Sequence, residues 1–196
     1  MRCPPERLVV AITGASGAPY ARRMLNVLRS MRDAGTAPQV AVVVSSTAPQ
    51  VWALECGGDL HAGVAPFPVW GGRDYNAPFA SGSAGWDAMV IVPCSMSTVS
   101  RIAHGLSDSL LTRAADVMIK EKRTLVVVPR ETPMSAIHLA NLLRLAELGV
   151  TVAPAMPSFY SQPTCVEALI DTVVARVFDH LGLGRDLVVP WGTGPT

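Results

Sequence analysis

The stretch Leu8-Val9-Val10-Ala11-Ile12-Thr13-Gly14-Ala15-Ser16-Gly17-Ala18 decides the fold. Its first five residues form a continuous apolar run, which is typical of a strand covered by helices on both faces. A glycine-rich turn follows, and then an amphipathic stretch from Tyr20 to about Ala34 that Gly35 ends. Backbone N–H groups at such a helix N-terminus favour an anion. Because the turn has neither GxGxxG nor GK[ST], it indicates a phosphate ligand without indicating NAD or ATP.

The rest of the chain repeats the alternation of strand and helix. We expect further strands at 39–44, 88–92, 125–128 and 150–153, and helices at 47–55, 95–104, 110–122, 135–148 and 165–183. Residues 56–83 are dense in glycine and proline and predict a long loop with one short strand near 68–70. This order predicts an α/β fold with a parallel sheet, and the absence of a linker or repeat predicts a single domain over residues 1–196.

Composition limits the partners. The 196 residues are 49% hydrophobic and 16% charged, which favours a homo-oligomer over the alternative of a compact monomer with a large core. A net charge of +1 with no basic run makes nucleic acid an unexpected partner. The apolar run near the N-terminus is too short to span a membrane, and we expect a cytoplasmic protein.

Three turns carry chemistry, and each follows a predicted strand. Besides the first turn, they are Ser95-Met96-Ser97-Thr98 and Pro129-Arg130-Glu131-Thr132-Pro133. Carboxyl ends of parallel strands meet at one edge of a sheet, where ligands bind. The Arg130–Glu131 pair suits a phosphate and a proton there, whereas the hydroxyls at 95–98 either bind a phosphate or cap a helix.

Other polar residues give weaker signals. Arg113, Asp116 and Lys120 share a helix face and, taken alone, indicate a solvated ion-paired surface. The four cysteines have no CxxC spacing, the four histidines have no metal spacing, and no metal site is expected. Cys94 is expected to be a small apolar filler at a strand end.

Together, the motifs resemble the flavin prenyltransferase family (the UbiX/Pad1 group), within the homo-oligomeric flavin-containing cysteine decarboxylase fold group. The matching segments are 12–18, 80–83, 93–95, 103–105, 110–117, 120–121, 128–133, 137–139 and 154–160. They occur in order over about nine-tenths of the chain.

The resemblance implies a Rossmann-like (flavodoxin-like) three-layer flavoprotein. It implies a metal-independent enzyme that joins the dimethylallyl group of dimethylallyl monophosphate to N5 and C6 of reduced FMN. The product, prenylated FMN, would serve a decarboxylase of the UbiD type, and the assembly would be a dodecamer.

The resemblance also implies roles for individual residues. FMN would be held by Gly14, Ala15, Ser16, Ser45, Ser95, Met96, Ser97, Thr98 and Arg130. The prenyl phosphate would be bound by Lys120, Arg130, Tyr160 and Arg176, contributed by more than one subunit. Lys120 would also have a catalytic role. Tyr75, Tyr160 and Trp191 would offer aromatic faces to the cationic allyl fragment. Glu131 would also line the prenyl site and shuttle protons, Glu55 would position groups, and Ser16 would assist the proton relay.

Some positions depart from the family pattern. Ala21 stands where a glycine often follows the first-helix tyrosine, Ser46 where a lysine often follows Ser45, and Tyr75 where a tryptophan is usual. The segment between Glu55 and Tyr75 is shorter than expected, and we expect it to lack a helix.

Two other functions remain open. A flavin-dependent decarboxylase of the same fold would carry a histidine on the helix at 47–55 and two asparagine motifs, which this chain lacks. An FMN-binding accessory protein that carries flavin to a decarboxylase would not need Lys120, Glu131, Tyr160 and Arg176.

Overall fold

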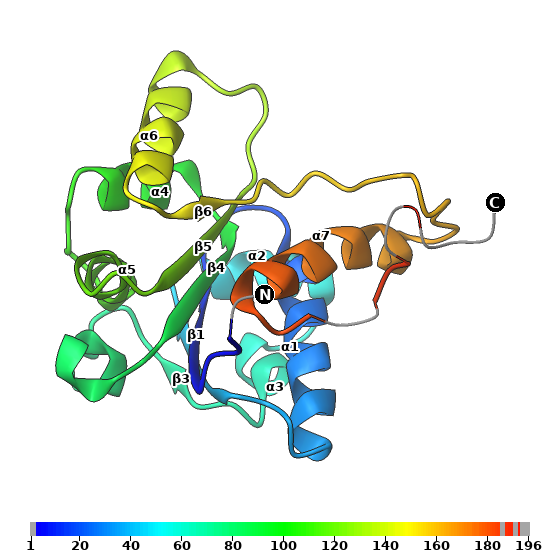
Figure 1. The fold of residues 1–196 in the computed structure, drawn as a ribbon, viewed down its shortest axis with the longest axis horizontal. Helices are drawn as coiled ribbons and strands as arrows, with labels where there is room; N and C mark the ends of the chain where they lie inside the picture. Colours follow the sequence, from blue (N-terminus) through cyan, green and yellow to red (C-terminus); the bar gives the residue numbers. More distant parts are fainter. Residues whose placement is uncertain (1–2, 185–186, 190–191, 193–196) are drawn as a thin grey trace.

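A computed structural model describes residues 3–184, 187–189 and 192. The described part forms a parallel sheet in the order β3-β2-β1-β4-β5-β6 (Figure 1). The strands are β1 (Arg7–Ile12), β2 (Gln39–Val44), β3 (Val69–Trp70), β4 (Ala88–Cys94), β5 (Thr124–Pro129) and β6 (Thr151–Val152). This confirms the predicted α/β, flavodoxin-like fold. The order of strands reverses between β1 and β4, which is where open sheets of this kind bind ligands.

Helices cover both faces of the sheet. They are α1 (Ala18–Asp33), α2 (Ala48–Cys56), α3 (Leu60–Val64), α4 (Met96–Ala103), α5 (Leu110–Lys120), α6 (Ala136–Glu147) and α7 (Val166–Leu181). Alternate strand residues face opposite layers, as the pleat requires. Leu8, Val10 and Ile12 pack with α1, α2, α3 and α7, and Val9 and Ala11 pack with α4, α5 and α6. Two separate cores therefore hold the three layers together.

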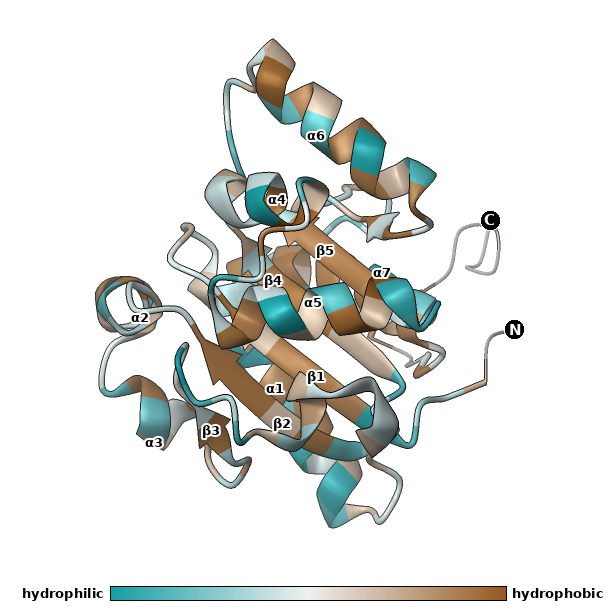
Figure 2. Cartoon of the chain, turned by 90° about the vertical axis from the view of Figure 1, so that its left-hand side faces the viewer, coloured by the Kyte–Doolittle hydropathy of each residue, from teal (hydrophilic) through white to brown (hydrophobic). Residues whose placement is uncertain are grey.

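Helix α6 differs from the other helices in what it buries. It packs against α4 and β6, with apolar and polar residues mixed along it (Figure 2). Only Asn141, Leu142 and Leu145 are buried on it. Four large apolar side chains of the helix or its end remain exposed: Ile137, Leu139, Leu143 and Leu148. None of the described helices is long and apolar enough to cross a membrane.

The segment at 56–83 corrects the sequence-based expectation. It was predicted as a loop with one short strand and as lacking a helix, but α3 lies within it, and Asp59 caps this helix by accepting a hydrogen bond from the Ala62 N–H at 2.9 Å. The short strand is present as β3, and two 3-10 turns follow, η1 (Pro78–Ala80) and η2 (Gly82–Ala84). The other predicted elements are confirmed to within about three residues, and α1 begins earlier than expected, at Ala18.

Candidate active site at the carboxyl edge of the sheet

Thr13 joins the ends of the two strands at the switch point. Its hydroxyl donates to the Pro93 carbonyl at 2.7 Å and accepts from the Ser95 N–H at 2.9 Å. Thr13 is buried, so these bonds are protected from water. The turns after β1 and β4 are therefore held side by side as one wall of a site.

A crevice of about 1320 Å³ opens along this edge. Of the residues predicted to hold FMN, Gly14, Ser45, Ser95, Ser97 and Thr98 line it. Ala15 and Met96 are buried instead, and the Met96 side chain packs in the core on the α4 face. The sequence therefore identified Gly14 and four of the hydroxyl side chains that line this crevice, whereas Ser16 and Arg130 are not among its lining residues.

Close packing at Gly14 shapes the crevice. A Cβ atom at this position would overlap the side chain of Thr47 at the start of α2. The Thr47 hydroxyl lies 3.3 Å from the Ser45 hydroxyl. The first and second turns therefore meet only because residue 14 has no side chain.

The hydroxyls at the start of α4 form a connected group. The Ser95 hydroxyl lies 3.1 Å from that of Ser97 and 3.0 Å from that of Thr98, and it accepts the Thr98 N–H at 3.3 Å. Ser95 thus caps the helix, which was one of the two roles that the sequence predicted for the hydroxyls at 95–98. Ser97 is exposed toward the crevice, so capping and ligand binding are compatible here.

The N-terminus of α1 is occupied by a carboxylate of the chain itself. Glu55, near the end of α2, accepts the N–H groups of Gly17 and Ala18, both at 2.8 Å. Partial burial raises the pKa of Glu55, but hydrogen bonds from the Ser16 side chain and the two N–H groups, together with the charge of Arg130, outweigh it, so the pKa lies below its ordinary value. The first turn predicted an anion at this helix N-terminus. At the N–H groups of Gly17 and Ala18, that anion is the Glu55 carboxylate.

Arg130 and Glu131 follow β5 at the same edge. The Arg130 N–H donates to the Cys94 carbonyl at 3.3 Å, and its Nε donates to the Ser16 carbonyl at 3.1 Å. The Glu131 carboxylate accepts the neighbouring Thr132 N–H at 3.0 Å. Ser16, Glu55 and Arg130 are thus brought together, with Glu131 next in the chain.

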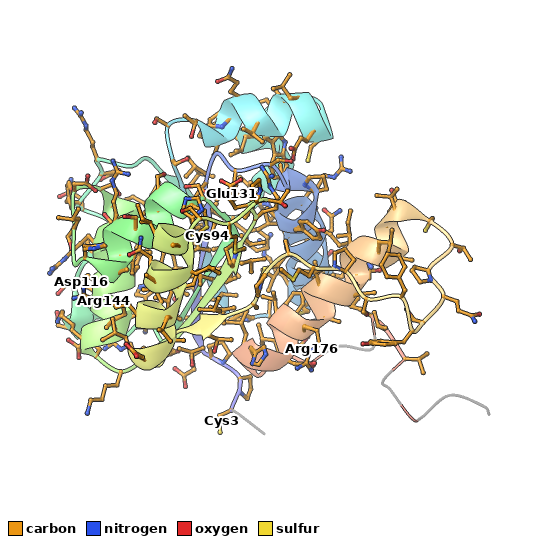
Figure 3. All side chains as sticks on the ribbon, turned by 90° about the horizontal axis from the view of Figure 1, so that it is seen from above. Cys3, Cys94, Asp116, Glu131, Arg144 and Arg176 are labelled. Carbon is orange, nitrogen blue, oxygen red and sulfur yellow. The ribbon has the colours of Figure 1, made fainter. Side chains whose placement is uncertain are left out.

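Other predicted site residues lie elsewhere in the chain. Lys120 ends α5 at the edge where β5 begins, Tyr160 is 76% exposed on the segment before α7, and Arg176 forms an exposed ion pair with Asp179 at 2.8 Å. Figure 3 shows Arg176 on α7, well apart from Glu131. Tyr75 is 49% exposed in the turn after β3. Trp191 lies outside the described residues.

The crevice also contains residues that the sequence did not single out. Gly71, Gly72, Arg73 and Asp74 follow β3 and line it from the segment predicted as a loop. At its rim, Arg101 donates to Asp108 at 3.0 Å. The short strand predicted near 68–70 could have pointed to residues 71–74, because the carboxyl end of a parallel strand reaches the same edge of the sheet.

Cys94 lies at this edge of the sheet but is not placed to act as a nucleophile. Cys94 is fully buried, and burial raises the pKa of its thiol far above the ordinary value. Within the described ranges, no three His, Cys, Asp or Glu side chains gather as a group that could hold a metal ion.

Comparisons with known proteins agree with this geometry. The sequence profile of the Flavoprotein family matches residues 2–178. The flavin prenyltransferase UbiX of Pseudomonas aeruginosa is 44% identical over 202 residues, covering 96% of this chain and 95% of that protein. The flavin prenyltransferase UbiX of Thermoplasma acidophilum is 45% identical over 186 residues, covering 94% and 99%.

Solved structures give the same result. A dodecameric FMN-dependent UbiX-like decarboxylase from Escherichia coli O157:H7 has a TM-score of 0.88 and 41% identity, covering 94% of this chain and 98% of that one. AnUbiX (PadA1), in complex with FMN and dimethylallyl pyrophosphate, has a TM-score of 0.90 and 37% identity, covering 99% and 100%. The chain therefore belongs to the Flavoprotein family and, within it, to the flavin prenyltransferases of the UbiX type.

Proposed function

We propose that this chain, as a single flavoprotein domain, transfers a dimethylallyl group from dimethylallyl monophosphate to N5 and C6 of reduced FMN. One observation carries the proposal. Arg130 is anchored on the Ser16 carbonyl, beside the Glu55 carboxylate, at the edge of the sheet where the large crevice opens. The fixed Arg130 cation and the carboxylates of Glu55 and Glu131 beside this crevice suit phosphate departure coupled to proton transfer.

The crevice residues fit FMN. Its lining offers the hydroxyls of Ser45, Ser95, Ser97 and Thr98, with the bare backbone of Gly14 between them. These groups would hold the cofactor, with Ala15 and Met96 contributing backbone and Arg130 completing the site. When bound, reduced FMN supplies the nucleophilic nitrogen and carbon that accept the prenyl group.

The phosphate would be gripped by residues of more than one chain. Five residue steps separate Thr124 from Pro129 on β5, which is about 17 Å of extended strand, and Lys120 precedes this strand whereas Arg130 follows it. The two cations therefore lie at opposite ends of β5, which favours a phosphate held by two chains. A neighbouring copy would bring Lys120, and Tyr160 and Arg176 would complete the site.

Assembly of copies is therefore part of the proposal. The exposed apolar side chains of α6 would be covered in a homo-oligomer, as would Phe159, which is 71% exposed. The E. coli relative is dodecameric, and we propose a dodecamer here.

Phosphate departure builds negative charge that Arg130 and Lys120 stabilise. The allyl fragment left behind is cationic, and Tyr75, Tyr160 and Trp191 would face it. Glu131 would take the proton released as the second bond forms, because among the described residues its carboxylate accepts one hydrogen bond, from the local Thr132 N–H. Glu55 would hold Ser16 in place, and the Ser16 hydroxyl would relay a proton near the flavin nitrogen.

The product, prenylated FMN, would pass to a decarboxylase of the UbiD type in the cytoplasm. The test is anaerobic incubation of the purified protein with reduced FMN and dimethylallyl monophosphate, followed by mass spectrometry of the released flavin. We expect a mass increase of one prenyl unit. Recovery of unmodified FMN, while a competent relative works alongside, rules the proposal out and leaves flavin carriage or a flavin-dependent decarboxylase as the alternatives.

Glu131→Gln tests the proton role separately. We expect it to bind FMN as the unmodified protein does and to form product more slowly, because an amide cannot take a proton at neutral pH. Unchanged turnover would remove Glu131 from the mechanism.

A further inference from the structure

The chain segment that ends α5 gathers three charged side chains in one turn. The N–H of Lys122 donates to the Ile119 carbonyl at 3.0 Å and that of Arg123 to the Met118 carbonyl at 2.8 Å. This is the hydrogen-bond pattern of a Schellman motif, with Lys122 left-handed at a φ of 55°. The motif turns the chain back on itself, so that the side chains of residues 120, 121 and 123 meet.

Glu121 lies between the two cations and pairs closely with one of them. Its Oε1 lies 2.6 Å from the Lys120 Nζ, whereas its Oε2 lies 3.9 Å from the Arg123 Nη2. The Arg123 Nη2 donates to the Gly82 carbonyl at 2.6 Å, and its Nη1 is buried with no hydrogen-bond partner among the described residues. Arg123 therefore has unused capacity for a carboxylate.

The same carboxylate packs against the turn that precedes β4. Gly82 is buried, and a Cβ atom there would overlap the Glu121 side chain. On either side of it, the exposed hydroxyls of Ser81 and Ser83 lie 3.0 Å apart. Lys120 and these two hydroxyls thus form an exposed cluster of hydrogen-bond donors. Within this cluster, the Lys120 ammonium group is paired with Glu121.

We propose that Glu121 controls access of phosphate to Lys120 by moving its ion pair between Lys120 and Arg123. This inference rests on the proposed function, in which Lys120 binds the prenyl phosphate. Without phosphate, Glu121 neutralises Lys120. When phosphate binds, Lys120 turns toward it and Glu121 closes the gap to Arg123, which removes a carboxylate from beside the anion and gives the spare Arg123 N–H an acceptor.

The exchange also works in reverse. Prenyl transfer leaves inorganic phosphate behind, and the return of Glu121 to Lys120 competes with this product for the same ammonium group. Arg123 is the more enclosed of the two cations, with a side-chain exposure of 20% against 46% for Lys120. Arg123 therefore suits the role of a fixed second partner for Glu121, whereas Lys120 is exposed enough to turn from Glu121 to the phosphate.

Binding of inorganic phosphate to the FMN-loaded native assembly, measured by isothermal titration calorimetry, tests this directly. Glu121→Gln keeps the side-chain shape over Gly82 and removes the competitor, so phosphate should bind about two- to fivefold more tightly, the range for an ion pair near the surface. Arg123→Gln traps Glu121 on Lys120, so phosphate should bind more weakly by a similar factor. The double variant should resemble Glu121→Gln, and the gain should vanish when Lys120→Ala is added.

The controls separate this from structural damage. Arg123→Lys keeps the charge and should bind phosphate almost as the unmodified protein does. Asp33→Asn, at the exposed end of α1, makes the same change in net charge and should leave phosphate affinity unchanged. Weaker or unchanged phosphate binding by Glu121→Gln overturns the inference, as does an unmodified protein that binds no phosphate at all.

The outcome is independent of the prenyl-transfer assay. A protein that forms no prenylated FMN but shows these phosphate affinities refutes the proposed function and retains the exchange. A working prenyltransferase whose phosphate affinity ignores Glu121→Gln retains the function and refutes the exchange.

Discussion

Replacing Glu55 by glutamine should lower the thermal stability of the protein. The carboxylate accepts two N–H groups at the start of α1, both at 2.8 Å. Glutamine retains an acceptor oxygen at nearly the same place, so the change removes the charge while leaving the shape. The expected loss is therefore the difference between charged and neutral hydrogen bonds, together with the interaction with the helix dipole.

The magnitude follows from these contacts. Charged hydrogen bonds contribute about 1 kcal/mol more than neutral ones, and a charge at a helix N-terminus adds about 0.3–1 kcal/mol. Because Glu55 is only partly buried, solvent screening reduces the total to about 1–2 kcal/mol. In a chain of this size, about 2–4 °C of Tm corresponds to each kcal/mol, so Glu55→Gln should lower Tm by about 2–8 °C.

Thermal unfolding followed by circular dichroism at pH 7 and at lower pH is the measurement, at one protein concentration because assembly affects Tm. The pKa of Glu55 is lowered from its ordinary value of 4.5 by folding. Its stabilisation is therefore fully present above about pH 4.5 and disappears as the pH falls through the lower folded pKa. The Tm difference between the two proteins should accordingly shrink below pH 4.5.

Asp33→Asn, at the exposed end of α1, is the matched control, because a carboxylate at a helix C-terminus is not stabilising. Its Tm should stay the same or rise slightly. The reasoning is refuted if Glu55→Gln unfolds at the same temperature as the unmodified protein at pH 7. A difference that is equal at pH 7 and pH 4 refutes it as well.

Three further predictions test other parts of the structure. Gly14→Ala should weaken FMN binding about tenfold or more in a fluorescence titration, because its Cβ overlaps Thr47. Combining Gly14→Ala with Thr47→Gly should recover part of the affinity, and no recovery would contradict the overlap. Lys122→Gly should raise Tm by up to about 4 °C, since a left-handed backbone costs a non-glycine residue about 1 kcal/mol, and calorimetry showing a lower Tm would count against this strain. Cys94 should resist alkylation in the native protein while exposed Cys3 reacts, and mass spectrometry of labelled peptides would expose the opposite order.

The sequence predicts the sheet well because buried parallel strands are nearly continuous apolar runs. The segment 125–128 could not be anything else in an α/β chain, and it fixed the position of Arg130 beside the other turns. The short helix α3 was missed because five residues give no measurable period, and only Asp59 marked its start. Short elements depend on packing, here on burial of Leu60 and Val64, which local pattern does not reveal.

The candidate site was predictable where it depends on strand ends and not where it depends on side-chain partners. Ser45 and Ser95 had to reach the crevice because they follow β2 and β4, the two strands on either side of β1. That Glu55 would bind the N-terminus of α1 requires α2 to lie against α1, and no sequence spacing shows this. The ion pair of Arg101 and Asp108 likewise depends on how the chain turns between α4 and α5.

The separation of Lys120 and Arg130 at opposite edges of the sheet has a consequence for mixed assemblies. On the proposed assignment, each active centre takes one of these cations from one chain and the other from its neighbour. We expect chains carrying Lys120→Ala to be inactive alone, and likewise chains carrying Arg130→Ala. Assembled together in equal amounts, they would leave about one quarter of the centres with both cations intact, because each centre draws its two halves independently. Activity would then require the interface between two chains, and two genes that each encode an inactive chain would together supply a working enzyme.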